Sequence, residues 1–126
     1  MMLDETRKVV ESYFEAWTTN NVRAAYALLA DDLEYTGPTS TYKRAEELWP
    51  ELQSFAAMSK WARIVELIVA GQRAALLYDC ELPQPVGILR IASFYHVEKG
   101  KIRTHGTAFD ATLFRQFEGR KSETGQ

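Results

Sequence analysis

The sequence predicts an α+β domain in which helices come first and an antiparallel sheet follows. Up to about residue 58, apolar side chains recur three or four positions apart, which is typical of amphipathic helices. From residue 61 onward, four longer runs rich in β-branched and aromatic residues are separated by short turns, which indicates strands. The 126 residues are 46% hydrophobic and 25% charged, as in one globular domain. This order favours an α+β class with one curved sheet wrapped around the helices.

The first two predicted elements are helices joined by a tight turn. Asp4 is the expected N-cap of the first helix, and the polar run at residues 18–21 ends it. Asn21 is the expected N-cap of the second helix. The apolar faces of the two helices carry Val9, Val10, Tyr13, Phe14 and Trp17, and then Ala24, Ala25, Leu28 and Leu29.

A short strand and a third helix come next. The strand is expected at residues 33–36, where Gly37 and Pro38 end it. The helix is predicted over residues 42–58, with Pro50 inside it. Because proline removes a backbone donor and disfavours helix at the preceding residue, we expect a kink there or two abutting helices.

Four strands are predicted in the second half of the chain, at residues 61–70, 74–82, 87–97 and 101–114. Short connections, with a hairpin turn at Lys99 and Gly100, predict an antiparallel meander. Residues 1–126 are thus expected to form a single domain, in which the polar residues 119–126 are a flexible tail.

Charge and composition exclude several functions. There are 15 basic and 17 acidic residues and no block of Lys or Arg, so we expect no nucleic-acid partner. No apolar run approaches the roughly 20 residues of a membrane span, and residues 1–7 lack the apolar core of a signal peptide. Cys80 is the only cysteine, and the two histidines lack a metal-ligand spacing. We therefore expect a cytoplasmic protein with no cofactor, no metal and no membrane partner.

Four stretches carry a resemblance to a known family: residues 10–17 (VESYFEAW), 29–33 (LADDL), 100–102 (GKI) and 109–110 (FD). Together with the order of elements, they resemble the nuclear transport factor two-like superfamily over residues 3–117. Within it, the chain is most similar to SnoaL-like polyketide cyclases, ketosteroid isomerases and limonene-epoxide hydrolases. The resemblance implies a cone-shaped fold in which three helices close one side of a curved sheet around a mostly apolar pocket.

The resemblance makes Tyr13 a candidate catalytic residue. In ketosteroid isomerases a tyrosine at this point of the first helix belongs to the oxyanion hole, where its hydroxyl donates to a developing enolate. The general base and the carboxylic acid of those isomerases correspond to Gly37 and Ala92 here, and neither can transfer a proton. The alternative reading of Tyr13 is a core tyrosine on an amphipathic helix.

Asp79 and His105 are the other two candidate catalytic residues. Strand alternation puts Asp79 on the same face as Glu81, and by composition alone that acidic face should be the solvated one. The resemblance to limonene-epoxide hydrolases instead places Asp79 in the pocket, with Leu77 where that family has an arginine. It also places His105 there, so that Asp79 would orient its ring for acid–base chemistry. The alternative for His105 is a hydrogen-bonded structural residue.

The pocket implied by the resemblance predicts both a ligand and a partner. The expected ligand-binding residues are Phe14, Trp17, Tyr35, Trp49, Phe55, Leu77, Ala92, Phe94, Thr107 and Phe109. Such a lining suits a small hydrophobic carbonyl or polycyclic compound, on which the protein would act as an isomerase, cyclase or dehydratase. The alternative is a non-catalytic ligand-binding or interaction module of the same fold. Because the long strands carry apolar residues on both faces, we also expect a homodimer formed through the sheet.

Overall fold

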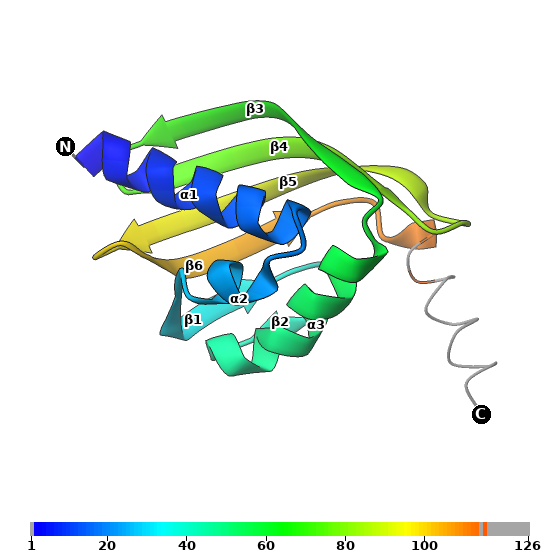
Figure 1. Cartoon of the computed structure of the whole chain (residues 1–126), viewed down its shortest axis with the longest axis horizontal. Coiled ribbons are helices and arrows are strands. Elements are labelled where there is room, and N and C mark those ends of the chain that lie inside the picture. Colours follow the sequence, from blue (N-terminus) through cyan, green and yellow to red (C-terminus); the bar gives the residue numbers. More distant parts are fainter. Residues whose placement is uncertain (1, 114, 116–126) are drawn as a thin grey trace.

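The computed structural model describes residues 2–113 and 115, which form three helices and one curved, six-stranded sheet (Figure 1). The helices are α1 (Met2–Thr18), α2 (Val22–Tyr26) and α3 (Ala45–Met58). The strands are β1 (Leu29–Thr36), β2 (Thr41–Tyr42), β3 (Trp61–Ala70), β4 (Arg73–Leu82), β5 (Gly87–Glu98) and β6 (Lys101–Ala108). The predicted α+β class is confirmed.

The sheet is mixed rather than purely antiparallel. Its strand order is β2-β1-β6-β5-β4-β3, and the run from β3 to β6 is the predicted antiparallel meander. The turn between β5 and β6 has positive φ at both Lys99 (53°) and Gly100 (75°), as a two-residue hairpin turn requires. The β1 strand pairs in parallel with β6, which the sequence did not predict.

The helices lie on one face of the sheet, which we call the inner face (Figure 1). Helix α1 contacts β3, β4, β5 and β6, and α3 contacts β1 and β2. The fully buried side chains of this core include Val10 from α1 and, from four strands, Leu33, Leu76, Ile91 and Ile102. Burial of this apolar surface is the main term that stabilises the fold.

One predicted helix cap was wrong and one was confirmed. Helix α1 begins at Met2, so Asp4 lies within the helix instead of capping it. Helix α3 runs from Ala45 through Pro50 to Met58 as one element, where two abutting helices were an alternative. Asn21 does cap α2, because its side chain accepts a hydrogen bond from the Ala24 N–H at 3.4 Å.

Three strand predictions differ from the structure. The first strand begins at Leu29, four residues earlier than expected, since its pairing with β6 starts there. The two-residue strand β2 was not predicted. The last strand ends at Ala108 instead of residue 114, because the Asp110 carboxylate accepts the Thr112 N–H at 3.1 Å and turns the chain. The predicted tail at 119–126 lies outside the described residues.

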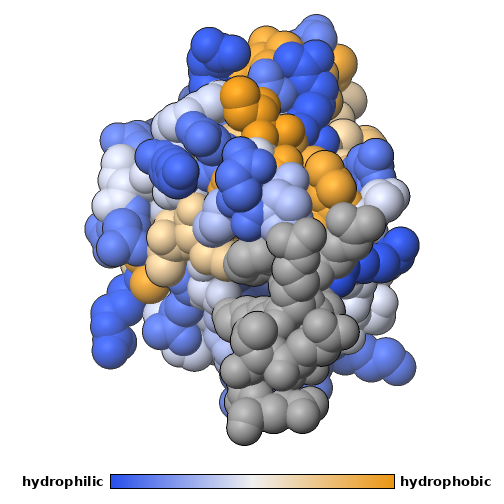
Figure 2. Space-filling view, turned by 90° about the vertical axis from the view of Figure 1, so that its right-hand side faces the viewer, coloured by the Kyte–Doolittle hydropathy of each residue, from blue (hydrophilic) through white to orange (hydrophobic). Residues whose placement is uncertain are grey.

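Large hydrophobic side chains remain on the surface of the described structure. On the side of the molecule where the β4–β5 turn lies, hydrophobic surface forms a band among hydrophilic side chains (Figure 2). The exposed large hydrophobic residues are Trp61, Ile64, Val65, Ile68, Ile88, Phe94 and Leu113. Most of them belong to strands β3 and β5. No described helix is long and apolar enough to cross a membrane.

The burial pattern predicts which leucine stabilises the fold. Replacing the fully buried Leu33 by alanine should lower the free energy of unfolding by about 2–5 kcal/mol, because the lost methyl groups leave a cavity in the core. The same change at Leu113, which is 43% exposed, should alter it by less than about 0.5 kcal/mol. Urea unfolding of both variants measures this, and equal losses would contradict the packing described above.

Candidate functional site

A central cavity of about 570 Å³ lies between the helices and the inner face of the sheet. Its walls come from α1, α3, five strands (β1, β2, β4, β5 and β6) and the loops that follow β1 and β6. The lining residues are Tyr13, Trp17, Tyr35, Pro38, Thr39, Tyr42, Leu48, Pro50, Glu51, Leu52, Ser54, Phe55, Met58, Tyr78, Ile91, Tyr95, His105, Thr107 and Phe109. A volume of this order suits a small organic ligand.

One row of aromatic side chains crosses four strands beneath this cavity. The register pairs Tyr95 with His105, His105 with Tyr35, and Tyr35 with Tyr42. The Tyr95 and His105 rings are stacked with centroids 4.5 Å apart, and His105 meets Tyr35 edge to face at 5.1 Å. The Tyr35 and Tyr42 rings are stacked at 5.9 Å. Since paired residues point to the same side of a sheet, the parallel β1–β6 pairing brings this row together.

His105 is the only imidazole among the described lining residues, and it is neutral at pH 7. Its Nδ1 lies 3.3 Å from the carbonyl oxygen of Phe94. Burial lowers its pKa from 6.5 to about 4, although the hydrogen bond to Phe94 acts in the opposite direction. In the neutral ring, the nitrogen that faces a carbonyl carries the hydrogen, so Nε2 keeps its lone pair. The site therefore offers a proton acceptor at Nε2.

This Nε2 has access to the cavity. No partner for it is found in the part of the chain that the structure describes. In that part, every fully buried side-chain nitrogen or oxygen has a hydrogen-bond partner. Nε2 is therefore not fully enclosed, and His105 lines the cavity.

Tyr13 on α1 supplies a hydrogen-bond donor next to His105. The two rings meet edge to face with centroids 5.8 Å apart. Burial raises the pKa of the Tyr13 phenol well above 10, with further contributions from Tyr95, Tyr35 and Glu51, so the hydroxyl stays protonated. Within the described residues no hydrogen bond to this hydroxyl is found, and by the same reasoning it is accessible from the cavity.

A second pair of hydroxyls lies where the resemblance aligned a catalytic base with Gly37. Tyr35 and Thr107 share a hydrogen bond of 2.8 Å. A Cβ added at Gly37 would lie 2.7 Å from the Tyr35 hydroxyl oxygen and 3.0 Å from Thr107 Oγ1. The Tyr35 hydroxyl thus fills the space that a side chain at position 37 would need. Burial raises the pKa of Tyr35 to about 12.

Glu51 on α3 is a site residue that the sequence reasoning missed. It is the only carboxylate among the described lining residues. Its Oε1 accepts hydrogen bonds from Ser40 Oγ at 2.9 Å and from the Tyr42 hydroxyl at 3.0 Å. A signal was present: Glu51 follows Leu48 by three positions and precedes Phe55 by four, so it shares the apolar face of the helix.

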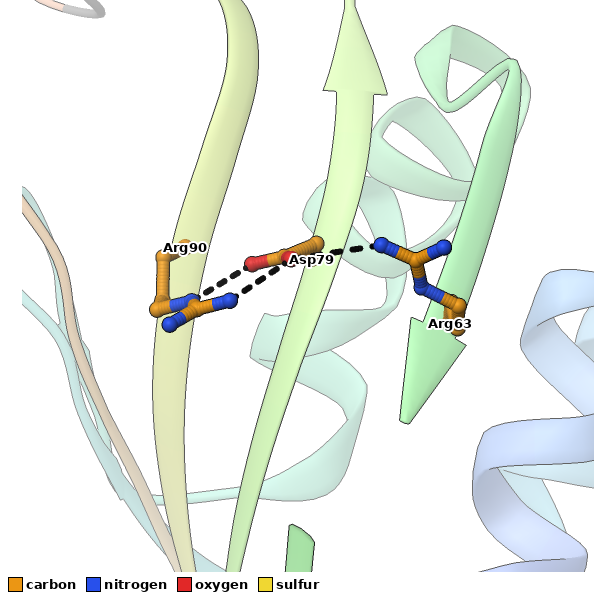
Figure 3. A network of polar contacts seen from close by, with 3 residues as sticks. All are labelled: Arg63, Asp79 and Arg90. Atoms are coloured by element: carbon orange, nitrogen blue, oxygen red, sulfur yellow. Dashed lines mark hydrogen bonds and ion pairs between the residues drawn. The ribbon is translucent and has the colours of Figure 1, made fainter. Parts of the chain in front are cut away.

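The structure does not bring Asp79 to His105. Asp79 lies on the outer face of the sheet, where strand pairing sets it beside Arg63 and Arg90 (Figure 3). Arg90 donates from Nε and Nη2 to the two carboxylate oxygens at 2.8 and 2.9 Å, and Arg63 lies 3.8 Å away. The hydrogen bonds from Arg90 hold the pKa of Asp79 below its usual value. The placement of Asp79 in the pocket was therefore wrong. The composition argument gave the correct face, although Asp79 itself is only 7% exposed there.

Half of the expected ligand-binding residues line the cavity. They are Trp17, Tyr35, Phe55, Thr107 and Phe109. The others do not line it: Phe14 is buried against Trp17 and Tyr78, and Trp49 packs on Tyr26 beside a smaller hollow.

The remaining three expected residues, Leu77, Ala92 and Phe94, share the outer face with Asp79. Phe94 is 53% exposed there. Their placement in the pocket was wrong because β4 and β5 turn the other set of alternating side chains toward the cavity. These are Tyr78 of β4 and Ile91 and Tyr95 of β5.

No cluster of three or more His, Cys, Asp or Glu side chains that could hold a metal ion occurs in residues 2–113 and 115. The titratable and hydroxyl side chains that line the cavity there are those of tyrosine, serine, threonine, His105 and Glu51.

Comparison with known proteins identifies the family. Residues 10–105 match the SnoaL-like domain, so the chain belongs to the SnoaL-like domain family. A search of the curated proteins finds no match. Solved structures with the same fold include an NTF2-like protein of unknown function from Cytophaga hutchinsonii, 24% identical with a TM-score of 0.75 over 89% of this chain and 94% of that chain.

Two further structures show how widely the fold is shared. A candidate ketosteroid isomerase from Kribbella flavida is 20% identical, with a TM-score of 0.76 over 87% of this chain and 82% of that chain. An LEH-like epoxide hydrolase of M. tuberculosis is 16% identical, with a TM-score of 0.75 over 100% of both chains. These likenesses establish an NTF2-like fold, and a fold alone does not fix a reaction.

Burial of His105 predicts a pH-dependent stability. Between pH 6.5 and about 4 the unfolded chain binds a proton that the folded chain does not, so stability falls as pH falls through this window. Compared with His105→Phe, the wild type should lose up to about 3 kcal/mol more of its unfolding free energy between these pH values. Urea titrations of both proteins across the window test this. Parallel pH profiles would show that His105 titrates as in the unfolded chain.

Proposed function

We propose that this protein binds a small hydrophobic carbonyl compound in the central cavity and catalyses proton transfer at the carbon next to the carbonyl. The observation that carries the proposal is the adjacency of a protonated phenol, Tyr13, and a neutral imidazole, His105, both accessible from one cavity. No cofactor is needed for isomerisation, cyclisation or dehydration of this kind, because each step moves only protons and electron pairs.

The roles follow from the two groups. The Tyr13 hydroxyl donates a hydrogen bond to the carbonyl oxygen of the ligand. His105 Nε2 takes a proton from the adjacent carbon, and the electron pair of that C–H bond moves to form an enolate. The charge on the enolate oxygen strengthens the hydrogen bond from Tyr13, and the imidazolium returns its proton at another carbon. The developing anion also favours the charged form of His105, which offsets its low pKa.

A second candidate function is non-catalytic binding of the same ligand class. The low pKa of His105 favours it, because an imidazole with a pKa of about 4 is a weak base before the enolate forms. In that case Tyr13 and His105 only supply one donor and one acceptor to a bound ligand.

A homodimer is proposed to form through the outer face of the sheet. Ile68 and Phe94 flank Ala75 in one row across β3, β4 and β5, and they are 57% and 53% exposed. Beyond the neighbouring row, Arg63 and Arg90 share the single carboxylate of Asp79. Exposed apolar side chains gathered on one sheet face favour burial against a second copy of the chain.

The proposed roles predict a selective pattern of variants. A thermal-shift screen of steroids, anthraquinones, terpenoid epoxides and flavonoids finds the ligand, since ligand binding to the folded state raises the melting temperature. Ketones among the hits are then assayed by NMR for exchange of α-protons with deuterated solvent. We expect Tyr13→Phe to slow exchange about 10²–10³-fold and His105→Phe about 10²–10⁴-fold.

Asp79→Asn is the control for this assay, since its carboxylate lies on the opposite face of the sheet from His105. It should exchange and bind as the wild type does. Binding without exchange in the wild type supports the second candidate function. Loss of exchange in Asp79→Asn, with Tyr13→Phe fully active, would refute the assignment of the site.

The dimer is tested by sedimentation equilibrium at micromolar concentration. Phe94→Glu places a charge in the proposed interface and should give a monomer, whereas Glu34→Gln, an exposed change on β1, should leave a dimer. A monomeric wild type at these concentrations would rule out the proposed interface.

A further inference from the structure

The described side chains that line the central cavity carry negative charge and no positive charge. Glu51 is the only acidic lining side chain in the described part of the chain, and no Lys or Arg lines the cavity there. His105 does not balance this charge, because burial keeps its pKa near 4 and its ring neutral at pH 7. An anionic ligand group would therefore find no cationic side chain in the cavity and would be repelled by Glu51.

The Glu51 carboxylate is held by hydroxyl groups from the neighbouring loop and strand. Ser40 and Tyr42 both donate to Oε1, at 2.9 and 3.0 Å, and neither donates to Oε2. These two hydroxyls belong to the loop before β2 and to β2 itself, so they fix the end of a side chain that projects from α3. A hydrogen bond between Tyr35 and Glu51 also contributes to the raised pKa of Tyr35. Because a carboxylate has about four lone-pair sites, Glu51 retains capacity to accept from a ligand as well.

Aromatic rings form much of the remaining wall. Tyr13, Trp17, Tyr35, Tyr42, Phe55 and Tyr95 all line the cavity. The face of each ring carries partial negative charge, which attracts a cation and has no comparable effect on a neutral group of the same shape. An aromatic wall combined with a single carboxylate is the arrangement that recognises ammonium groups.

We infer that the ligand of the central cavity carries a cationic nitrogen, a protonated or quaternary amine, which binds between the Glu51 carboxylate and the aromatic wall. The inference rests on the proposed function, in that both need a ligand in this cavity. It adds the substrate class: an amine-bearing hydrophobic compound whose carbonyl lies against Tyr13 and His105.

The alternative is that the hydrogen bonds of Glu51 are purely structural and only connect α3 to β2. The two readings differ in what charge contributes. Glu51→Gln keeps a side-chain oxygen that accepts hydrogen bonds from Ser40 and Tyr42, so it preserves the connection between α3 and β2 and removes the charge. If the Glu51 carboxylate binds a cation, this variant should lose the preference for a cationic ligand over a neutral one. If the hydrogen bonds are purely structural, the variant should keep whatever preference the wild type has.

The experiment compares two ligands of the same shape by calorimetry at pH 7. They are 4-(trimethylammonio)benzyl alcohol, which is cationic, and 4-tert-butylbenzyl alcohol, its neutral isostere. The wild type should bind the cation at least about tenfold more tightly. Glu51→Gln should lose this preference. Glu34→Gln, which removes the same charge from an exposed site on β1, should keep it.

Each other outcome overturns the inference. If the wild type binds the neutral isostere equally or more tightly, the inference is overturned, although the cavity still binds a ligand. A preference that survives in Glu51→Gln shows that Glu51 does not bind the cation. If neither alcohol binds but the neutral ketones of the screen do, the inference fails and the proposed function stands. If neither alcohol and no ketone binds, both fail.

Discussion

The parallel pairing of β1 with β6 is the constraint on which the site depends. It aligns Tyr35 with His105, and the antiparallel neighbours extend the row to Tyr42 on one side and Tyr95 on the other. A slip of one residue in this register would turn Tyr35 to the opposite face and break its hydrogen bond to Thr107. The fold and the chemistry of the cavity are therefore specified by the same backbone hydrogen bonds.

Much of the fold could be predicted from local patterns. Strand β3 was placed at its observed bounds, and β4 and β5 to within one residue, because long runs between clear turn residues leave little choice. The β1–β6 pairing could not be predicted, since it joins segments far apart in the chain. The strand β2 pairs with nearby residues of β1, but its two residues are too few to show an alternating pattern. The family resemblance supplied the class of fold, which the SnoaL-like domain match then confirmed.

The site was predicted less well because strand faces had to be chosen. Tyr13 and His105 do line the cavity, whereas Asp79 does not, and the error came from preferring a family position over the charge pattern of β4. Arg90 lies directly opposite Asp79, and a cross-strand ion pair of this kind is consistent with the outer face. Glu51 could have been found by looking for a charged residue on the apolar face of the predicted third helix.

The polar groups of the cavity are divided between two structural settings. Tyr13 and His105 lie on the longest helix and on a strand paired along both sides, whereas Glu51, Ser40 and Tyr42 lie on α3, a loop and the shortest strand, at the edge of the sheet. Loops and edge strands tolerate insertion and substitution better than central strands do. Substitutions at Ser40 and Tyr42 should therefore disturb the fold less than substitutions at Tyr13 and His105 do. The wall of the cavity that Ser40 and Tyr42 help to form can thus be altered without changing the central strands.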